Sequence, residues 1–588
     1  MNRRTVWAPS ASSVALVTAN ERVEMRPGKR GWWRVDLSPE QSRADYGFSL
    51  DGGPTLPDPR SPFQPHGVHG LSRPVDHSAF EWRHARWRQA PLSSALIYEL
   101  HIGAFTAAGT FDAAAERLDY LRDLGVTHVE VMPVAEFSGT RGWGYDGVDL
   151  YAPHHSYGGP DGMKRFVDAA HGHNLGVILD VVYNHLGPEG GYLGKFGPYF
   201  TDRYCTPWGD AINLDDRDSE EVRQYFCDNA LMWLRDYRVD GLRLDAIHAI
   251  FDASAIHFLE QIGIQVRDLE AEVGRNLLVI AESDLNLPRI VTPREAGGYG
   301  LDAQWNDDFH HALHTILTGE NHGYLDDFGS IAQLAKALTR GFVYDGTFSK
   351  TRRRRHGAPV VGLSAHRFIA FLQNHDQVGN RALGERLGHL LTIDQMKLAA
   401  AVLMTAPFVP MLFQGEEWNA SSPFQYFTDH QDKDLAESVR KGRKAEFAHF
   451  VANASEVPDP QDQNTFERSK LDWNEPERGT HREILEWYRQ LIRLRRCSPD
   501  FHNGKLDPDA VTFDEPKRWM CISRGRALVV CNLSPISQYV PVADARELRI
   551  SLASRSGVRL DAASIDLPPV SVAILIPKDR EPSTGVNE

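Results

Sequence analysis

The segment Gly241-Leu242-Arg243-Leu244-Asp245 decides the fold, because this short apolar run carries an arginine and ends in a carboxylate. Side chains alternate along a strand, so Arg243 and Asp245 face the same way. Three other apolar runs end in polar residues in the same manner: Asp180-Val181-Val182-Tyr183-Asn184-His185, Ile280-Ala281-Glu282 and Gln373-Asn374-His375-Asp376. Apolar packing does not select such endings, whereas active-site groups of a parallel barrel lie at the C-terminal ends of its strands. The four endings therefore predict an α/β barrel with a polar site at one end.

Short apolar runs alternate with helical patterns from about residue 95 onward, which is typical of βαβ units. The expected strands are eight in number: 95–100, 128–134, 177–182, 241–245, 277–282, 301–305, 367–373 and 408–414. A closed (β/α)8 TIM barrel needs this number of strands. The expected helices include 111–124, ending at Gly125, then 161–173, 220–237 and, as the last of the barrel, 482–496.

Further strand-like runs lie on both sides of the barrel. Runs 14–18, 31–37 and 46–50, with a turn at Asp51-Gly52-Gly53, indicate an N-terminal β-sandwich. Runs 527–532 and 570–576 indicate a C-terminal β-domain. We therefore expect three domains: a β-sandwich like a carbohydrate-binding module at 1–88, the catalytic barrel at 89–497 and a β-domain at 498–588.

Charge and cysteine content exclude several classes of partner. The formal net charge of -15 argues against nucleic acid, because phosphates need a basic face. The basic run 352–355 is interpreted as a solvated loop. Five widely spaced cysteines form no CxxC pair, so neither a zinc site nor a disulfide framework is expected, and a reducing compartment fits. No run of about 18 apolar residues occurs, and Pro9 interrupts the apolar start. We expect no membrane span, no signal peptide and a cytoplasmic protein.

The four strand endings resemble the signature regions of the α-amylase family of glycoside hydrolases in residue type, order and approximate spacing. The resemblance covers nearly the whole chain. It implies retaining cleavage of an α-glucosidic bond, with Asp245 as nucleophile, Glu282 as acid/base and Asp376 as a third carboxylate that distorts the sugar ring and stabilises positive charge. Retention requires a nucleophile and a separate proton donor, so Glu282 must be protonated at the first step.

The resemblance also assigns supporting residues. It implies that His185 and His375 donate to sugar hydroxyls and that Tyr145 forms an aromatic platform beneath the ring. Arg243 faces the nucleophile, and a fixed cation there keeps the carboxylate ionised and oriented. Asp180 is expected to organise the barrel mouth rather than to react.

The chain departs from the family pattern after the nucleophile. Many relatives have Lys-His a few positions on, whereas the run here is Asp245-Ala246-Ile247-His248, without lysine. His248 stays a candidate substrate contact. Asn184 stands where calcium-dependent members have a ligand, but the rest of such a site is not recognisable. The cluster His310, His311 and His314 is interpreted as packing, because no acidic spacing supports a metal site. We expect no metal and no cofactor.

Longer segments resemble one subgroup of the family, whose members cut the α-1,4 bond beside the terminal trehalose of malto-oligosyltrehalose. The segments are 48–62, 183–191, 297–309 and 373–384. The resemblance implies that trehalose and a maltodextrin are released, and that a malto-oligosyltrehalose synthase makes the substrate. The leaving group is then a bent α,α-1,1-linked disaccharide. Candidates to accommodate it are Asp284, Trp305, Asp307 and Phe309, with Trp305 either stacking on glucose or packing in the core.

Three alternatives stay open. A glycogen branching enzyme shares the sandwich-plus-barrel plan but transfers a chain to another glucan, and an α-1,6 debranching hydrolase is the next alternative. A non-catalytic glucan-binding protein on a decayed barrel is the alternative of another class. The complete set of Asp245, Glu282 and Asp376 argues against it. A glucan-binding assay of the Glu282→Gln variant separates binding from catalysis.

Overall fold

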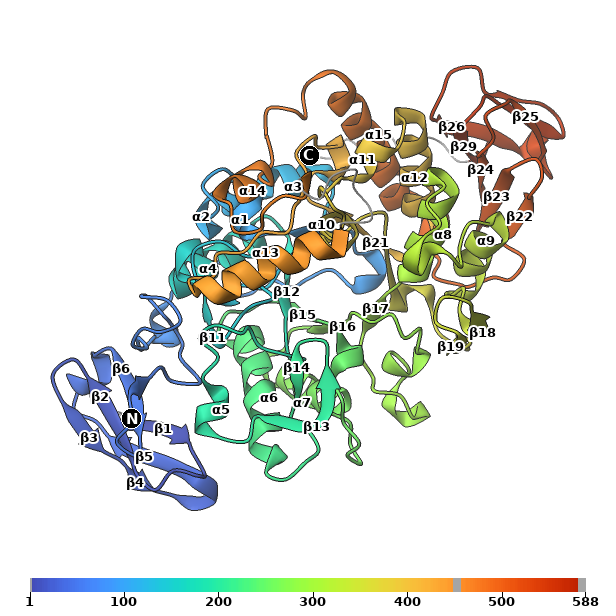
Figure 1. Ribbon diagram of the computed structural model, residues 1–588. Coiled ribbons are helices and arrows are strands. Elements are labelled where there is room, and N and C mark those ends of the chain that lie inside the picture. Colours follow the sequence, from blue (N-terminus) through green and yellow to red (C-terminus); the bar gives the residue numbers. More distant parts are fainter. Residues whose placement is uncertain (1–2, 448–455, 580–588) are drawn as a thin grey trace.

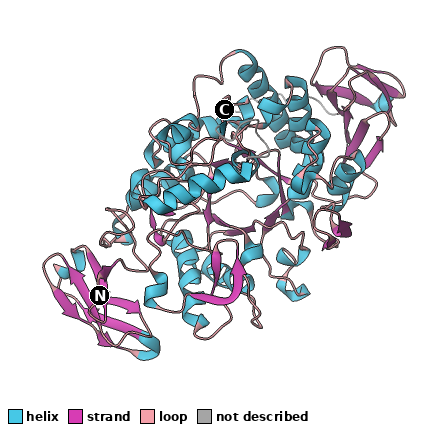
Figure 2. Ribbon diagram, in the orientation of Figure 1, coloured by secondary structure: helices cyan, strands magenta, loops and turns pink. Residues whose placement is uncertain are grey.

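The structure, a computed structural model, describes residues 3–447 and 456–579, so the outer limits expected for the terminal domains, residues 1 and 588, lie outside the described residues. Parallel strands close into a barrel at the centre of the molecule, and helices surround it (Figures 1 and 2). The barrel strands in chain order are β8 (Ile97–Leu100), β9 (His128–Val131), β12 (Gly176–Val181), β15 (Gly241–Leu244), β16 (Leu278–Ala281), β17 (Ala303–Trp305), β20 (Phe368–Phe371) and β21 (Val409–Phe413). This confirms all eight predicted strands, with ends that differ by a few residues.

The ring closes because β8 pairs in parallel with both β9 and β21. Barrel-facing side chains of alternate strands pack on one another, and Ile97, Ile178 and Ile280 are each fully buried in this interior cluster. The C-terminal ends of the strands meet at one rim, as the sequence predicts for the polar residues that follow them.

Three of the expected helices are confirmed, namely α4 (Gly159–Gly172), α6 (Ser219–Arg235) and α15 (Gly479–Cys497). Each has a buried apolar face and lies beside the barrel (Figure 1). The α6 helix, for example, buries Phe226 and Trp233. Burial of such large side chains is the main driving force for docking these helices on the barrel.

The expectation of one helix over 111–124 is wrong. The segment divides into α2 (Phe111–Ala115) and α3 (Leu118–Leu124), because Arg117 between them has φ -110° and ψ 3°, outside the helical region. The predicted stop at Gly125 is confirmed, since its φ of 104° is the left-handed conformation that glycine adopts readily.

Sheets flank the barrel at both ends of the chain (Figure 2). The N-terminal sheets have the orders β1-β5-β4 and β3-β2-β6-β7, formed by β1 (Arg3–Trp7), β2 (Val14–Thr18), β3 (Arg22–Glu24), β4 (Arg26–Pro27), β5 (Trp32–Asp36), β6 (Tyr46–Leu50) and β7 (Thr55–Leu56). The C-terminal sheets have the orders β22-β23-β24-β29-β26 and β25-β28-β27, formed by β22 (Val511–Asp514), β23 (Trp519–Arg524), β24 (Ala527–Asn532), β25 (Gln538–Pro541), β26 (Leu548–Ala553), β27 (Arg559–Leu560), β28 (Ser564–Leu567) and β29 (Ser571–Pro577).

One hydrophobic core runs through these parts. Its largest cluster includes Trp7 and Phe48 from the N-terminal sheets, Tyr98 from the barrel and Val529 from the C-terminal sheet. Among the described residues, no helix is both long and apolar enough to cross a bilayer.

Candidate active site

The predicted nucleophile stands at the end of β15 in a fixed orientation. Arg243 Nη1 donates to Asp245 Oδ1 at 2.7 Å, and Asn184 Nδ2 donates to Asp245 Oδ2 at 2.8 Å. Asp245 is only 8% exposed and Arg243 is fully buried. Each carboxylate oxygen therefore accepts a hydrogen bond from a fixed donor, and the two bonds hold the carboxylate in one orientation.

The predicted acid/base follows β16. Glu282 Oε2 accepts from the backbone N–H of Ala246 at 2.6 Å and lies 3.7 Å from Arg243 Nη2. Burial raises the pKa of Glu282 to about 8, with help from the negative charges of Asp245 and Asp307, although Arg243 acts in the opposite direction. Glu282 is therefore mainly protonated at neutral pH, which is the form a proton donor to a leaving group requires.

The third carboxylate follows β20 and is the most accessible of the three. The Asp376 side chain is 43% exposed, and its Oδ2 lies 3.5 Å from His375 Nε2. His375 Nδ1 lies 2.6 Å from Glu99 Oε1, a buried carboxylate of β8. Burial alone would lower the pKa of His375, but the charges of Asp376 and Glu99 outweigh it and raise the pKa to about 9. His375 is therefore a cation beside Asp376 at neutral pH.

Tyr145 links His375 to Asp180 of β12. Its hydroxyl donates to Asp180 Oδ2 at 2.6 Å and lies 2.7 Å from His375 Nε2, and the two rings stack with centroids 5.0 Å apart. Asp180 also accepts from Arg243 Nη1 at 2.8 Å. Burial raises the pKa of Asp180 to about 6, against the opposing charge of Arg243. Asp180 thus joins Tyr145 to Arg243, which fits the organising position expected of it.

His185 follows the end of β12, and its contact with a sugar hydroxyl stays a prediction. Its Nε2 lies 3.0 Å from the carbonyl oxygen of Tyr145, and its Nδ1 faces Asn184 Oδ1. Both ring nitrogens therefore face protein oxygens. The ring stacks on Trp208, with centroids 4.4 Å apart and an interplanar angle of 5°.

Trp208 was not among the predicted site residues. It is 49% exposed at the turn between β13 (Phe200–Thr206) and β14 (Gly209–Ile212). A large aromatic ring held flat beside the site is a suitable surface for a sugar. The sequence Thr206-Pro207-Trp208-Gly209 could have indicated this residue. Its proline and glycine predict a turn, and a tryptophan in a surface turn is not explained by core packing.

Two of the four acceptor-side candidates lie in the core. Trp305 is 2% exposed and the Arg243 guanidinium lies 4.3 Å from its ring centroid, so its face is already covered. Phe309 is fully buried on α8 (Asp307–Thr318) and packs edge-on against Phe408. Direct contact of either ring with substrate was a wrong expectation, because both side chains fill interior space. Of the two interpretations given for Trp305, stacking on glucose or packing in the core, its burial fits the second.

The other acceptor-side candidates lie near the carboxylates. Burial and the charges of Asp284 and Asp376 raise the pKa of Asp307 to about 7. Asp284 Oδ2 accepts from Arg352 Nη2 at 2.8 Å. Burial would raise the pKa of Asp284, but the charge of Arg352 outweighs it and lowers the pKa, and His248, exposed in the turn Ile247–Ala249, adds to the lowering.

The basic run 352–355 is a solvated loop in part. Residues 353–355 are exposed, but Arg352 is half-buried on Asp284. Arg352 lies in the turn between β18 (Asp345–Ser349) and β19 (Arg354–Gly357), and its ion pair with Asp284 attaches this hairpin to the site.

Tyr324 is a further residue near the carboxylates that the sequence analysis did not identify. It is 55% exposed, and its hydroxyl donates to Gln377 Oε1 at 3.3 Å, next to Asp376.

Histidines elsewhere could suggest a metal. His314 of the predicted packing cluster pairs with Glu320 at 2.8 Å, and burial lowers the pKa of both His310 and His311. Another group, Glu136, His154 and His155, brings its ligand atoms within 4.8 Å of one another.

The geometry of this second group favours hydrogen bonding over metal binding. His154 Nδ1 accepts from the Ser156 N–H at 3.2 Å, which leaves the proton of a neutral ring on Nε2. That Nε2 is the atom that faces Glu136 Oε1, at 3.8 Å. A protonated nitrogen cannot bind a metal.

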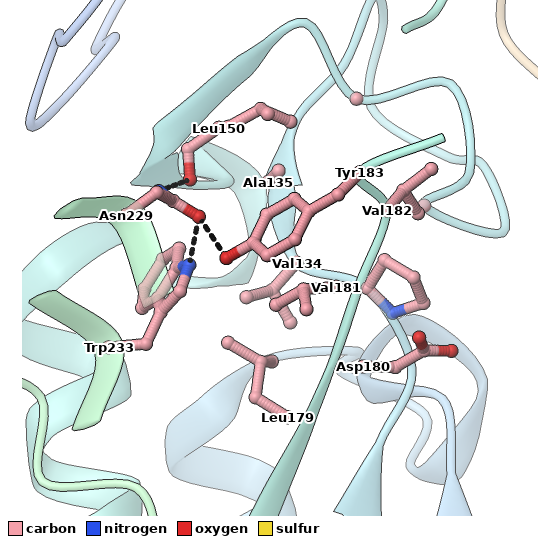
Figure 3. A pocket seen from close by; sticks show the side chains of 13 residues that line it. Val134, Ala135, Leu150, Leu179, Asp180, Val181, Val182, Tyr183, Asn229 and Trp233 are labelled. Atoms are coloured by element: carbon pink, nitrogen blue, oxygen red, sulfur yellow. Dashed lines mark hydrogen bonds between the residues drawn. The ribbon is translucent and has the colours of Figure 1, made fainter. Parts of the chain in front are cut away.

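Behind the rim lies a cavity of only about 10 Å³, lined by Leu179, Asp180 and Tyr183 among others (Figure 3). This volume is room for one water at most and excludes a sugar. Asn229 Oδ1 accepts from the Tyr183 hydroxyl at 2.6 Å and from Trp233 Nε1 at 3.1 Å, and Figure 3 shows these bonds together. These hydrogen bonds fix Tyr183, the residue immediately before Asn184. They therefore help to position the Asn184 side-chain amide, which donates to the nucleophile Asp245.

Several known proteins are similar to this chain in sequence. The family model "Alpha amylase, catalytic domain" matches residues 85–198. The malto-oligosyltrehalose trehalohydrolase of Rhizobium sp. (strain M-11) is 49% identical over 584 residues, covering 97% of each chain. That of Mycobacterium tuberculosis (strain H37Rv) is 49% identical over 543 residues, covering 91% of this chain and 93% of the relative.

A similar structure has also been solved. A crystal structure of a Salmonella typhimurium protein assigned to the alpha amylases superposes with a TM-score of 0.89 at 38% identity, covering 98% of this chain and 97% of the other. The barrel with its rim of carboxylates and the near-complete match to these relatives lead to one conclusion: the chain belongs to the malto-oligosyltrehalose trehalohydrolases of the α-amylase family.

Proposed function

We propose that the protein hydrolyses the α-1,4-glucosidic bond next to the terminal trehalose of malto-oligosyltrehalose, with retention, and releases trehalose and a maltodextrin. The observation that carries the chemistry is the placement of two carboxyl groups on one guanidinium: Arg243 lies 2.7 Å from Asp245 and 3.7 Å from Glu282. The guanidinium donates to Asp245 and fixes its orientation, whereas burial raises the pKa of Glu282 to about 8 and keeps it mainly protonated at neutral pH. An oriented carboxylate beside a protonated carboxyl group is what a double-displacement mechanism needs.

The steps follow from these positions. Asp245 attacks the anomeric carbon while Glu282 gives its proton to the leaving oxygen, so a glycosyl-enzyme ester forms and the trehalose unit departs. Glu282, now ionised, takes a proton from water, and the water attacks the ester to release the maltodextrin with its original anomeric configuration. Asp376 stabilises the positive charge that develops on the sugar, and the His375–Glu99 pair holds it in place.

No lysine follows the nucleophile in the run 245–248, so other residues must bind the trehalose unit on the acceptor side. Asp284 and Asp307 lie on the side of Glu282, with Arg352 and Tyr324 as further polar contacts. Exposed aromatic and polar groups spread over several loops suit a bent disaccharide better than one cation at a fixed point.

Product analysis tests the proposal. Malto-oligosyltrehalose is digested with the purified protein and the products are separated by chromatography. Free trehalose with a maltodextrin shortened by that unit is the expected result. Maltose alone, or a longer branched glucan as a branching enzyme would form, contradicts it.

Three further proposals concern the setting. We infer domain boundaries at residues 88/89 and 497/498, supported by the first barrel strand at Ile97 and the end of α15 at Cys497. We infer that a malto-oligosyltrehalose synthase supplies the substrate, because a terminal trehalose must be formed on the maltodextrin before it can be released. A cytoplasmic location is supported by the five cysteines, which are all free thiols.

A further inference from the structure

A second concave site lies on the flank of the barrel, away from the carboxylates. It is a cleft of about 810 Å³ between α3, the segment 473–478 and α15. We call it the arginine cleft; its defining residues are Arg117, Tyr120, Trp473, Arg478, Arg482 and Arg489. None of the site residues described above lines it.

The charge of the cleft is unusual for this chain. The whole protein has a formal net charge of -15, yet four guanidinium groups line the cleft against one carboxylate, that of Glu477. Within residues 3–447 and 456–579, none of the four guanidinium groups forms an ion pair within 4.0 Å or a hydrogen bond, although the charge of Arg478 acts on Asp472 outside the cleft. Arg117 lies 4.6 Å from the centre of the Trp473 ring. The cleft is therefore a concentrated positive field.

A solvated helix face of alternating charge would be expected to pair its carboxylates with its arginines, and among the described residues α15 does not do so. The α15 helix does carry Glu483 and Glu486, but neither lines the cleft. Glu483 pairs with Lys397 at 2.6 Å, and Glu486 accepts from Gln490. Glu486 is one turn from both Arg482 and Arg489 on the helix surface, yet within the described residues it forms no ion pair with either of them.

The arginines also occupy an electrostatically unfavourable place. Arg478 is the N-cap of α15 without a side-chain cap, no acidic residue stands in the first turn, and Arg482 follows one turn later. Cations at a helix N-terminus oppose the helix dipole, and an anion there relieves the conflict. Arg117 is the N-cap of α3, at the break between α2 and α3, and its guanidinium lies over the Trp473 ring at the cleft.

The floor of the cleft is aromatic and held in place. Trp473 Nε1 donates to the Phe105 carbonyl at 2.7 Å, and the Tyr120 hydroxyl donates to the buried Glu417 at 3.0 Å. The two rings meet edge to face, with centroids 5.1 Å apart. The two anchored rings give a partly apolar surface of fixed shape beneath the charged groups.

We propose that the arginine cleft binds a small phosphorylated metabolite, a sugar phosphate or a nucleotide. Guanidinium forks bind phosphate oxygens in pairs, and an aromatic floor accepts the sugar or base. The volume lies in the range of small-molecule sites. A neutral maltodextrin would bring no negative charge to a cleft with four cations and one carboxylate, so the cleft is distinct in chemistry from the substrate site.

Isothermal titration calorimetry of the full-length protein tests the proposal with glucose 6-phosphate, ADP, inorganic phosphate and maltotriose as separate probes. We expect at least one organic phosphate to bind more tightly than inorganic phosphate and maltotriose, with affinity that falls as salt rises. The probe that binds more tightly, ADP or glucose 6-phosphate, identifies the nucleotide or the sugar phosphate as the ligand type.

Two variants locate the binding. Arg482→Gln combined with Arg489→Gln removes two forks and is expected to weaken binding about tenfold or more. Arg493→Gln is the matched control, because Arg493 is exposed on the same helix but does not line the cleft, and it should bind as the unmodified protein does. Trehalose release and circular dichroism report that both variants are folded.

Three results overturn the proposal. The first is no heat from any phosphate up to about 10 mM. The second is equal weakening by the double variant and by Arg493→Gln, which would indicate only general charge attraction. The third is inorganic phosphate or maltotriose binding as tightly as the organic phosphates, because either would remove the reason for an arginine fork above an aromatic floor.

Discussion

At the scale of single residues, the site depends on one buried cation. Arg243 contacts Asp180 at 2.8 Å and Asp245 at 2.7 Å and lies 3.7 Å from Glu282. The sequence predicted the contact with Asp245, because residues two apart on a strand face the same way. It could not predict that the guanidinium would stack on Trp305, since that contact joins β15 to β17 and depends on barrel closure.

The first prediction concerns the two reacting carboxylates. Asp245→Asn and Glu282→Gln should each lower kcat by about three orders of magnitude or more, because one loses the nucleophile and the other the proton donor. Both changes keep the size of the side chain, so the fold should stay intact. Steady-state kinetics on malto-oligosyltrehalose measure the loss, and circular dichroism checks the fold. Near-normal turnover in either purified variant contradicts the assigned roles.

The second prediction concerns pH. The pKa of Glu282 is raised to about 8, so the protonated form is present below that value and is lost as pH rises through it. The alkaline limb of the kcat/KM profile should therefore lie near pH 8. The charge of Asp307 helps to raise this pKa, and Asp307→Asn should move the limb to lower pH.

The position of the limb, rather than the absolute rate, is the measurement, because Asp307 is also proposed to contact substrate. Asp268→Asn, at an exposed position on α7 (Phe258–Val273), is the control and should leave the limb in place. A limb that stays fixed, or moves to higher pH, in Asp307→Asn contradicts the assigned origin of the pKa.

At the scale of elements, the strands were predictable and the loops were not. Buried parallel strands such as β12 and β20 are continuous apolar runs, and this signal survives without knowledge of tertiary contacts. The β13–β14 hairpin, which carries Trp208, has exposed and mixed residues and so gave no comparable signal. Phe309 was a candidate because it belongs to the segment 297–309 that resembles the subgroup, but on the α8 helix it faces a different direction from Asp307.

The third prediction concerns the hairpin formed by β18 and β19. Its Arg352 reaches Asp284 at 2.8 Å, and both side chains are about one-third exposed, at 30% and 39%. Arg352→Gln should change the free energy of unfolding by less than about 1 kcal/mol, because exposed pairs contribute little. It should raise KM for malto-oligosyltrehalose about fivefold, since the hairpin and Asp284 lose their common position.

Arg353→Gln is the matched control, because Arg353 lies in the same turn and is exposed. Its KM should stay close to that of the unmodified protein. Equal KM values for the two variants would show that the hairpin needs no attachment to Asp284.

At the scale of the whole molecule, the flanking sheets and the barrel share a core, so they should unfold together. Trp7 is 4% exposed, packs edge-on against Tyr199 with centroids 5.4 Å apart, and donates its indole N–H to the Arg30 carbonyl at 2.9 Å. Trp32 adds a polar contact, with Nε1 donating to Glu221 of α6 at 3.0 Å. Contacts of this kind couple the stability of the N-terminal sheets to that of the barrel.

The fourth prediction follows from this coupling. Trp7→Ala should lower the free energy of unfolding by about 3–5 kcal/mol, because it leaves a cavity at the contact with the barrel. The midpoints from far-UV circular dichroism and from tryptophan fluorescence should move together in urea. Tyr539→Ala, 64% exposed on β25, removes an aromatic ring without a cavity and should change stability little. Two separate transitions in the Trp7 variant, with the barrel transition unmoved, would mean that the N-terminal sheets rest on the barrel without stabilising it.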